Sequence, residues 1–281
     1  MNSRTLEERW RRFRDARDAA LAEEHGWLSL TSFQWLGGEP APVDGVPGLW
    51  SSAGDTARLT AGAPDGLTVL ADGGLVEGTI TAILDDEESL LWVGYGGEDG
   101  RRVVIELARR AGRYALRTRD ASSPALTGFT GVPTFDYRPD LVVEGRFEPY
   151  AEPLLEPIAT AHPEVPGTHG TAGEVVFSLP GDHRRFRLRA AQDAAGALSI
   201  TFHDATNGVS TADWRKLTTR RPRPDGSVTL DFNRAINYPS AFTAYGTCPA
   251  PVGGNVVDAA IEAGERTPAG VPAALQASAS G

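Results

Sequence analysis

Short runs in which apolar and polar residues alternate, each followed by a turn rich in Gly, Asp or Pro, recur along most of this chain. Alternation with a period of two places successive side chains on opposite faces of a β-strand. An amphipathic helix would instead repeat its apolar residues every three or four positions. The pattern therefore predicts a mainly β protein, an antiparallel β-sandwich or barrel. We expect strands at residues 67–71, 75–84, 89–95, 102–107, 113–120, 141–147, 174–179, 184–190, 198–203 and 228–232.

Turn sequences connect these strands. Residues 72–74 (D-G-G) and 96–100 predict hairpin turns, because glycine adopts positive φ without strain. Residues 180–182 and 193–196 predict two further turns from their Pro, Gly and Asp content. Residues 26–38, which carry two Trp, predict a short buried strand or hairpin.

The N-terminal residues have a different period. Thr5 and Glu8 fit a capping box, and the apolar residues after them recur at helical spacing up to a stop at His25-Gly26. They predict an amphipathic helix over residues 5–24, with Arg and Glu on its solvated face. The expected organisation is a helix in 1–25, a single all-β domain in 26–266 with a subdivision near 120–140 as the alternative, and a flexible tail in 267–281.

Composition excludes several classes of protein. The 281-residue chain has a formal net charge of -10, which disfavours nucleic acid and anionic membranes as partners. A single cysteine excludes an internal disulfide and a Cys-rich metal site. The N-terminus lacks the apolar core of a signal peptide, and no apolar run is long enough to span a bilayer. We expect a soluble, cytoplasmic protein without cofactor or metal, and the oligomeric state is left open.

Several catalytic motifs are missing from the sequence. It has no Gly-rich loop followed by Lys-Ser or Lys-Thr, no G-x-S-x-G elbow and no H-E-x-x-H. These absences remove the commonest nucleotide-binding, serine-hydrolase and zinc-protease classes.

The segment 229–265 carries the densest group of polar residues with little periodicity. In its first strand a period of two places Asp231 and Asn233 on one face and Phe232 on the core face. If the polar face meets a cavity, Asp231 and Asn233 form an acceptor and donor pair, and Arg234 binds an anion. The alternative is that Asp231 and Asn233 cap the irregular backbone that follows, as Asx residues do at strand ends.

Two ionisable residues outside this segment, His203 and Arg117, are further candidates. His203 lies on the polar face of its strand and would be a general base if a carboxylate orients its ring, and an exposed strand histidine is the alternative. Arg117 shares a strand face with Arg119, and such a pair binds anions when it faces inward. On an outward face the pair is only solvated.

Cysteine and the remaining histidines give weaker signals. Cys248 precedes a proline in a loop, which favours a buried structural cysteine over a catalytic thiol. His162 and His169 lie seven residues apart in a Pro- and Gly-rich segment, but no further ligands at metal-binding spacing accompany them.

The last segment also resembles a known family. Residues 231–251 read D-F-N-R-A-I-N-Y-P-S-A-F-T-A-Y-G-T-C-P-A-P, which is similar to the signature D-F-N-[RK]-A-Y-N-P-P-C-A-F-T, then C-P-L-P-P, E-N and A-G-E, of the domain of unknown function 1684. Supporting matches are G-W-L-S-L (26–30), R-T-R-D (117–120), G-F-T-G-V (128–132) and F-H-D-A-T-N-G (202–208).

The resemblance adds residues to the candidate site and supplies no reaction. By family analogy the matching positions include Asn237, Asn255 and Glu265, beside the residues of the D-F-N-R motif. Ile236 stands where the family prefers Tyr, and Ser240 where it often has Cys. If the family site uses that Tyr or Cys, this member has altered or lost activity.

Three functions follow as hypotheses. The first is a small-molecule hydrolase with Asp231 or His203 as acid or base and the other polar residues as substrate-binding groups. The second is a non-catalytic protein that binds a small molecule in the same pocket. The third is a structural or interaction module in which the motif is a clasp. The substrate-binding residues of the first hypothesis are Asn233, Arg234, Asn237, Arg117, Asn255 and Glu265.

Overall fold

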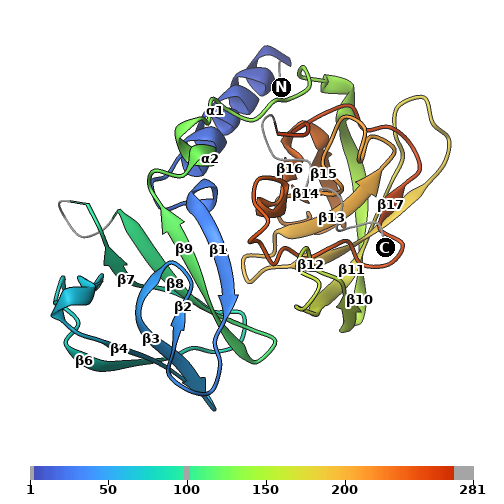
Figure 1. Cartoon of the computed structure of the whole chain (residues 1–281). Helices are drawn as coiled ribbons and strands as arrows, with labels where there is room; N and C mark the ends of the chain where they lie inside the picture. Colours follow the sequence, from blue (N-terminus) through green and yellow to red (C-terminus); the bar gives the residue numbers. More distant parts are fainter. Residues whose placement is uncertain (1–2, 98–101, 269–281) are drawn as a thin grey trace. The chain divides into compact units, whose positions relative to one another are not determined.

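The computed structural model describes residues 3–97 and 102–268 and is mainly β with an N-terminal helix, as the alternation predicted (Figure 1). The chain divides into two compact units, Ala20–Phe129 and Met1–Ala19 with Thr130–Gly281. All paired named strands are antiparallel, except for one short parallel pair near the C-terminus.

The unit Ala20–Phe129 contains two sheets. Their orders are β2-β3-β4-β6 and β1-β9-β8-β7-β5. Apolar side chains such as Trp50, Leu59 and Leu107, each at most 1% exposed, form one core cluster within this unit. The strands are β1 (Leu30–Trp35), β2 (Ala41–Val43), β3 (Val46–Ala53), β4 (Thr56–Ala61), β5 (Thr68–Val69), β6 (Gly78–Ile83), β7 (Ser89–Tyr95), β8 (Val103–Arg110) and β9 (Arg113–Asp120), with short helices η1 (Trp27–Ser29), η2 (Ala63–Asp65) and α2 (Pro124–Thr127).

One predicted hairpin is wrong in its pairing. The turn around Gly73 forms, but the residues on its two sides pair only at one isolated bridge, between Thr68 and Leu75. Gly78 then has φ 101 at the start of β6, and β6 pairs with β4 over its whole length. The hairpin β3–β4, which supplies that partner, was not predicted because glycines and a proline interrupt its alternation.

The second unit is built on one strongly curved sheet, a half-barrel, of order β15-β10-β11-β12-β13-β14-β16, with β17 beside β13 (Figure 1). Its strands are β10 (Val142–Ile158), β11 (Gly167–Phe177), β12 (Phe186–Gln192), β13 (Leu198–Asp204), β14 (Arg215–Thr218), β15 (Ser227–Asp231), β16 (Ile236–Asn237) and β17 (Val256–Val257). Its helices are α1 (Ser3–Leu21), which ends three residues before the predicted boundary, η3 (Pro139–Leu141), η4 (Phe232–Arg234) and η5 (Pro239–Ala241).

The core of the half-barrel follows the predicted parity. Leu188, Ile200, Leu230 and Phe232 are completely buried and belong to one apolar cluster. The segment that begins with β17 covers this core, because Val257, Ile261 and Ala263 pack into the same cluster. The C-terminal family motif is therefore part of the core as well as of the polar site.

Some predictions fall outside the described residues. The predicted tail 267–281 is described only for its first two residues, and residues 98–100 of the predicted turn 96–100 are also outside. Within the described ranges, no helix is long and apolar enough to cross a membrane.

Candidate functional site

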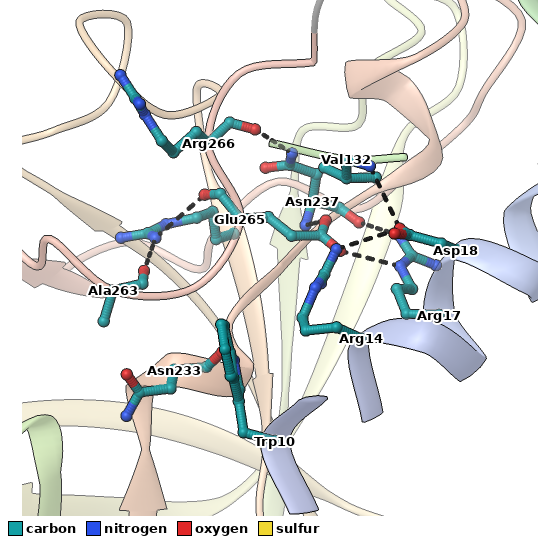
Figure 2. A network of polar contacts seen from close by, with 11 residues as sticks. Trp10, Arg14, Arg17, Asp18, Val132, Asn233, Asn237, Ala263, Glu265 and Arg266 are labelled. Carbon is teal, nitrogen blue, oxygen red and sulfur yellow. Dashed lines mark hydrogen bonds and ion pairs between the residues drawn. The ribbon is translucent and has the colours of Figure 1, made fainter. Parts of the chain in front are cut away.

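The carboxylate of Glu265 is the centre of a buried polar network beneath α1 (Figure 2). Its Oε1 accepts hydrogen bonds from Arg14 Nη1 at 2.6 Å and Arg17 Nε at 3.2 Å. Its Oε2 accepts the backbone N–H of Asn237 at 2.6 Å. The Glu265 side chain is 0% exposed. These hydrogen bonds and ion pairs compensate the cost of burying its negative charge, which would be large for a carboxylate without partners.

Two aromatic residues of α1 dock on the D-F-N-R motif. Trp10 Nε1 donates a hydrogen bond to the backbone oxygen of Asn233 at 2.9 Å (Figure 2). The guanidinium of Arg234 lies over the ring of Phe13, 4.5 Å from its centroid, at cation–π distance. Arg234 therefore meets a ring of α1 in this structure.

The G-F-T-G-V motif receives the end of the same helix. The backbone N–H of Val132 donates to the Asp18 carboxylate at 3.3 Å (Figure 2). Gly131 has φ +112, and a Cβ there would lie 3.1 Å from Asp18 Oδ2. A glycine is thus required both by the backbone conformation and by the approach of Asp18.

Asp231 and Asn233 hold local backbone. Asp231 Oδ1 accepts from Asn233 N at 3.2 Å and Nδ2 at 2.9 Å, and so caps η4. Asn233 in turn pairs its amide with the backbone of Arg138, accepting from N at 2.7 Å and donating to O at 2.9 Å. Burial raises the pKa of the Asp231 carboxyl, although its Asn233 hydrogen bonds and Arg234 oppose that shift.

Asn237 joins the clasped segments. Its Nδ2 donates to the backbone oxygen of Arg266 at 2.8 Å, beside the bond from its N–H to Glu265 (Figure 2). Its Oδ1 is buried and has no hydrogen-bond partner among the described residues. The Asn237 side chain is therefore committed to the chain's own backbone through its donor.

A second buried ion pair contains the Asp of the F-H-D motif. Asp204 and Arg215 are both 0% exposed in their side chains, and their 2.7 Å bond joins β13 to β14. Arg215 also donates to the carbonyl oxygens of Ile261 and Ala263, while Asp204 accepts the N–H of Ile261. This pair fixes the A-G-E segment against the half-barrel.

Asn255 replaces part of the β-ladder between β12 and β13. The register that pairs Ala191 with Ser199 would next bring Arg189 opposite Thr201. At that position the Asn255 amide accepts from Arg189 N at 2.8 Å and donates to the oxygens of Arg189 and Thr201 at 2.9 and 2.8 Å. The strands separate here, and the C-terminal segment enters between them as β17.

Gly264 allows the C-terminal segment to pack against the backbone of Phe232 and Ala235. It has φ +78, and a Cβ on it would lie 2.5 Å from the backbone oxygen of Ala235 and 2.8 Å from that of Phe232. Real Cβ atoms do not approach backbone oxygens so closely, so only glycine fits.

His203 lies on the face of β13 opposite Asp204, and Cys248 lies in the loop after η5. His203 Nδ1 bonds the backbone oxygen of Asp213 at 2.8 Å, and its ring meets Trp214 edge-on. Cys248 is 6% exposed, which agrees with the buried structural cysteine favoured by the sequence. Near it, burial raises the pKa of Tyr238 to about 12, and the Tyr238 hydroxyl lies 2.5 Å from that of Thr201.

Arg117 belongs to the other unit and to another network. Arg117 Nη1 and Arg119 Nε bond the buried carboxylate of Glu106 at 3.0 and 2.8 Å. Arg119 also donates to the carbonyl oxygens of His25 and Gly26, which joins the R-T-R-D and G-W-L-S-L motifs. The inward-facing pair binds an anion, as the sequence allowed, but that anion is Glu106.

The hollow found beside the motif is small and holds none of the predicted site residues. It measures about 250 Å³, is open to solvent, and is lined by Arg138, Asp140, Leu141, Leu179, Pro180, Asp182, Ala259, Ala260 and Glu262. In the described part of the chain, no group of three His, Cys, Asp or Glu side chains is placed to hold a metal ion.

The sequence-based site omits the arginines that complete these networks. Arg14 and Arg17 were assigned to the solvated face of α1, yet they follow Trp10 at i+4 and i+7 on one helix face. That spacing was a usable signal. No comparable pattern marks Arg215, since a buried arginine within an alternating strand looks like a solvated one.

The fold and the network define a class of protein: a mainly β chain whose curved sheet is closed by its own N-terminal helix and C-terminal segment. The family model described as "Protein of unknown function (DUF1684)" matches residues 127–266, and the chain belongs to this family. A solution NMR structure of an uncharacterized protein of Haloarcula marismortui is 28% identical, covers 50% of this chain and 78% of that chain, and has a TM-score of 0.42. No curated protein matches the chain.

Proposed function

We propose that the family motif is a structural clasp, and that the chain acts as a non-catalytic interaction module whose shape depends on that clasp. The observation that carries the proposal is the burial of the Glu265 carboxylate among partners from the chain itself. Its carboxylate is fully buried and is shared between two arginines of α1 and the N–H of Asn237. A residue that binds substrate would keep part of its hydrogen-bonding capacity for the ligand.

The other motif residues support the same role. Asn233 spends its amide on the Arg138 backbone, Asn237 donates to Arg266, and Asn255 bridges two strands. Each of these amides satisfies backbone groups in segments that lack a regular ladder. Together they fix α1, the loop before η3 and the C-terminal segment on one half-barrel.

A double-mutant cycle tests the clasp. Arg14→Gln and Glu265→Gln are each expected to lower the free energy of unfolding by about 3 kcal/mol, because each removes one member of a buried ion pair. The double variant should cost less than the sum, since the two side chains interact directly. Urea unfolding measures all four proteins.

Arg11→Gln is the matched control. Arg11 forms an exposed i,i+4 pair with Glu7, so its loss should cost less than about 0.5 kcal/mol. If Glu265→Gln costs no more than this control, the clasp is not what holds α1, and the proposal fails.

A small-molecule hydrolase is the second candidate. It is supported by Asp231, whose Oδ2 accepts no hydrogen bond from the described residues and lies 3.9 Å from Arg234 Nε, and whose pKa is raised by burial. His203 would be the alternative base. Screening wild type and Asp231→Asn against small esters checks this role. Equal turnover by both folded proteins would remove Asp231 as a catalyst.

The remaining expectations stay predictions. They are a cytoplasmic location, a small-molecule ligand, and no nucleic-acid or membrane partner. The net charge of -10 supports the last two exclusions.

A further inference from the structure

A further polar network lies on strands β10, β11 and β12. His169 Nδ1 is 2.8 Å from the hydroxyl oxygen of Thr171. The Thr171 hydroxyl donates to Glu156 Oε2 at 2.8 Å, and Glu156 Oε1 accepts from Arg189 Nη1 at 2.6 Å. None of these four side chains has a role in the contacts of α1 described above.

The direction of these hydrogen bonds fixes the tautomer of His169. Glu156 is paired with Arg189, and an ionised carboxylate can only accept. The single proton of the Thr171 hydroxyl therefore points to Glu156. The Thr171 oxygen must then accept its bond from His169, so Nδ1 carries the proton and Nε2 carries the lone pair.

The free nitrogen of this ring is accessible. Within the described residues Nε2 of His169 makes no hydrogen bond, and this atom is not fully buried. Thr171 behind it is 0% exposed, so the orienting bond is shielded from water. Burial lowers the pKa of the His169 ring, which keeps it neutral near pH 7.

We propose that Nε2 of His169 is the acceptor of a separate binding site for a neutral hydroxyl-bearing small molecule, with Thr171 and Glu156 as positioning residues. The surrounding charges select this class. Glu156 lies opposite His169 on the neighbouring strand β10, and its negative charge repels a carboxylate or phosphate. Arg189, the cation of the network, is already bonded to Glu156.

Side-chain nitrogen NMR of the full chain tests the tautomer. In wild type at neutral pH, His169 should show a protonated Nδ1 and an unprotonated Nε2. Thr171→Val should populate the opposite tautomer, and Thr171→Ser should restore the wild-type signals, since serine keeps the hydroxyl. A protonated Nε2 in wild type, or an unchanged tautomer in Thr171→Val, would overturn the proposal.

A second variant keeps the test open if Thr171→Val does not fold. Glu156→Gln removes the negative charge that favours the imidazolium, so the pKa of His169 should fall further. Glu152→Gln, at an exposed position of the same strand, should leave it unchanged. Equal His169 pKa values in all three proteins would show that Glu156 does not position the ring.

The ligand class is tested with glucose and acetate as probes. Added glucose should shift the Nε2 signal of His169 in wild type and not that of Thr171→Val. Acetate at equal concentration should shift neither. No response to glucose, or a larger response to acetate, would reject a site for neutral hydroxyl compounds.

Discussion

Both units contain buried carboxylates, and each of these carboxylates is paired with one or two arginines. Glu265, Asp204 and Glu106 are at most 7% exposed, and each bonds at least one arginine side chain. Replacing such a pair by apolar residues is often tolerated, whereas removing one partner is costly. We therefore expect a single conservative substitution at one of these positions, such as Glu to Gln, to lower the free energy of unfolding even though the new side chain is also polar.

Gly264 gives the sharpest prediction at this scale. Gly264→Ala should destabilise the protein by several kcal/mol or prevent folding, because the new Cβ meets two backbone oxygens at a positive φ. Gly253→Ala is the control, since nothing lies within 4 Å of its Cβ position. Thermal unfolding compares the two. Equal melting temperatures would contradict the observed fit of the C-terminal segment.

Asn255 gives a second prediction at the scale of single residues. Asn255→Ala leaves the Arg189 N–H and two carbonyl oxygens without partners, at a cost of about 1 to 3 kcal/mol. The Arg189 amide should then exchange its hydrogen much faster. Asn255→Asp keeps an acceptor for that N–H, so it should retain more protection there than Asn255→Ala. Similar exchange in wild type and Asn255→Ala would show that the amide does not replace the ladder.

Among the elements, α1 depends on single anchors. Trp10→Phe keeps an aromatic ring beside Tyr137 but removes the donor to Asn233, and should cost about 1 kcal/mol. Trp10→Ala also removes the ring and should cost about 3 kcal/mol or more. Hydrogen exchange in α1 should follow the same order. Wild-type protection in Trp10→Ala would mean that Trp10 is not an anchor.

The elements were predicted well wherever periodicity was clear. The strand of Leu198 to Phe202 and the strand ending at Asp231 show the expected parity, because a half-buried strand imposes a period of two. Asn233 was expected on the polar face but is 1% exposed, since η4 begins after Asp231 and the strand period stops there. The predicted helix of residues 5–24 corresponds to α1.

The site was less predictable than the strands. The motif located Asp231, Asn233, Asn237, Asn255 and Glu265, but nothing local shows whether an amide meets a ligand or a distant backbone segment. Partners such as Arg14 and Glu265, 251 residues apart, are set by tertiary packing. A charged residue on a helix is read as solvated until that packing is known.

At the scale of the whole molecule, the buried pairs predict sensitivity to acid. Burial alone would raise the pKa of the Glu106 carboxyl, but Arg119 and Arg117 hold it below its ordinary value. A lowered carboxyl pKa stabilises the folded state above the unfolded value of about 4.3, and this contribution is lost as the pH falls through the folded pKa. Stability should thus fall with decreasing pH in this range.

The variant Glu106→Gln checks that assignment. It should be less stable than wild type at pH 7 and should lose less of its remaining stability below pH of about 4. Glu39→Gln, at an exposed position, is the control and should keep the wild-type profile. Parallel pH profiles for wild type and Glu106→Gln would show that another group controls the acid transition.

The half-barrel unit is discontinuous in the chain, because it joins Met1–Ala19 to residues that begin at Thr130. During synthesis α1 emerges before the unit Ala20–Phe129, whereas the carboxylate that receives Arg14 and Arg17 emerges more than 240 residues after them. Chains fold from the N-terminus as they leave the ribosome. The unit Ala20–Phe129 can therefore complete its core while Trp10 and Phe13 still have no partner, and a nascent chain passes through a stage in which the apolar face of α1 is uncovered.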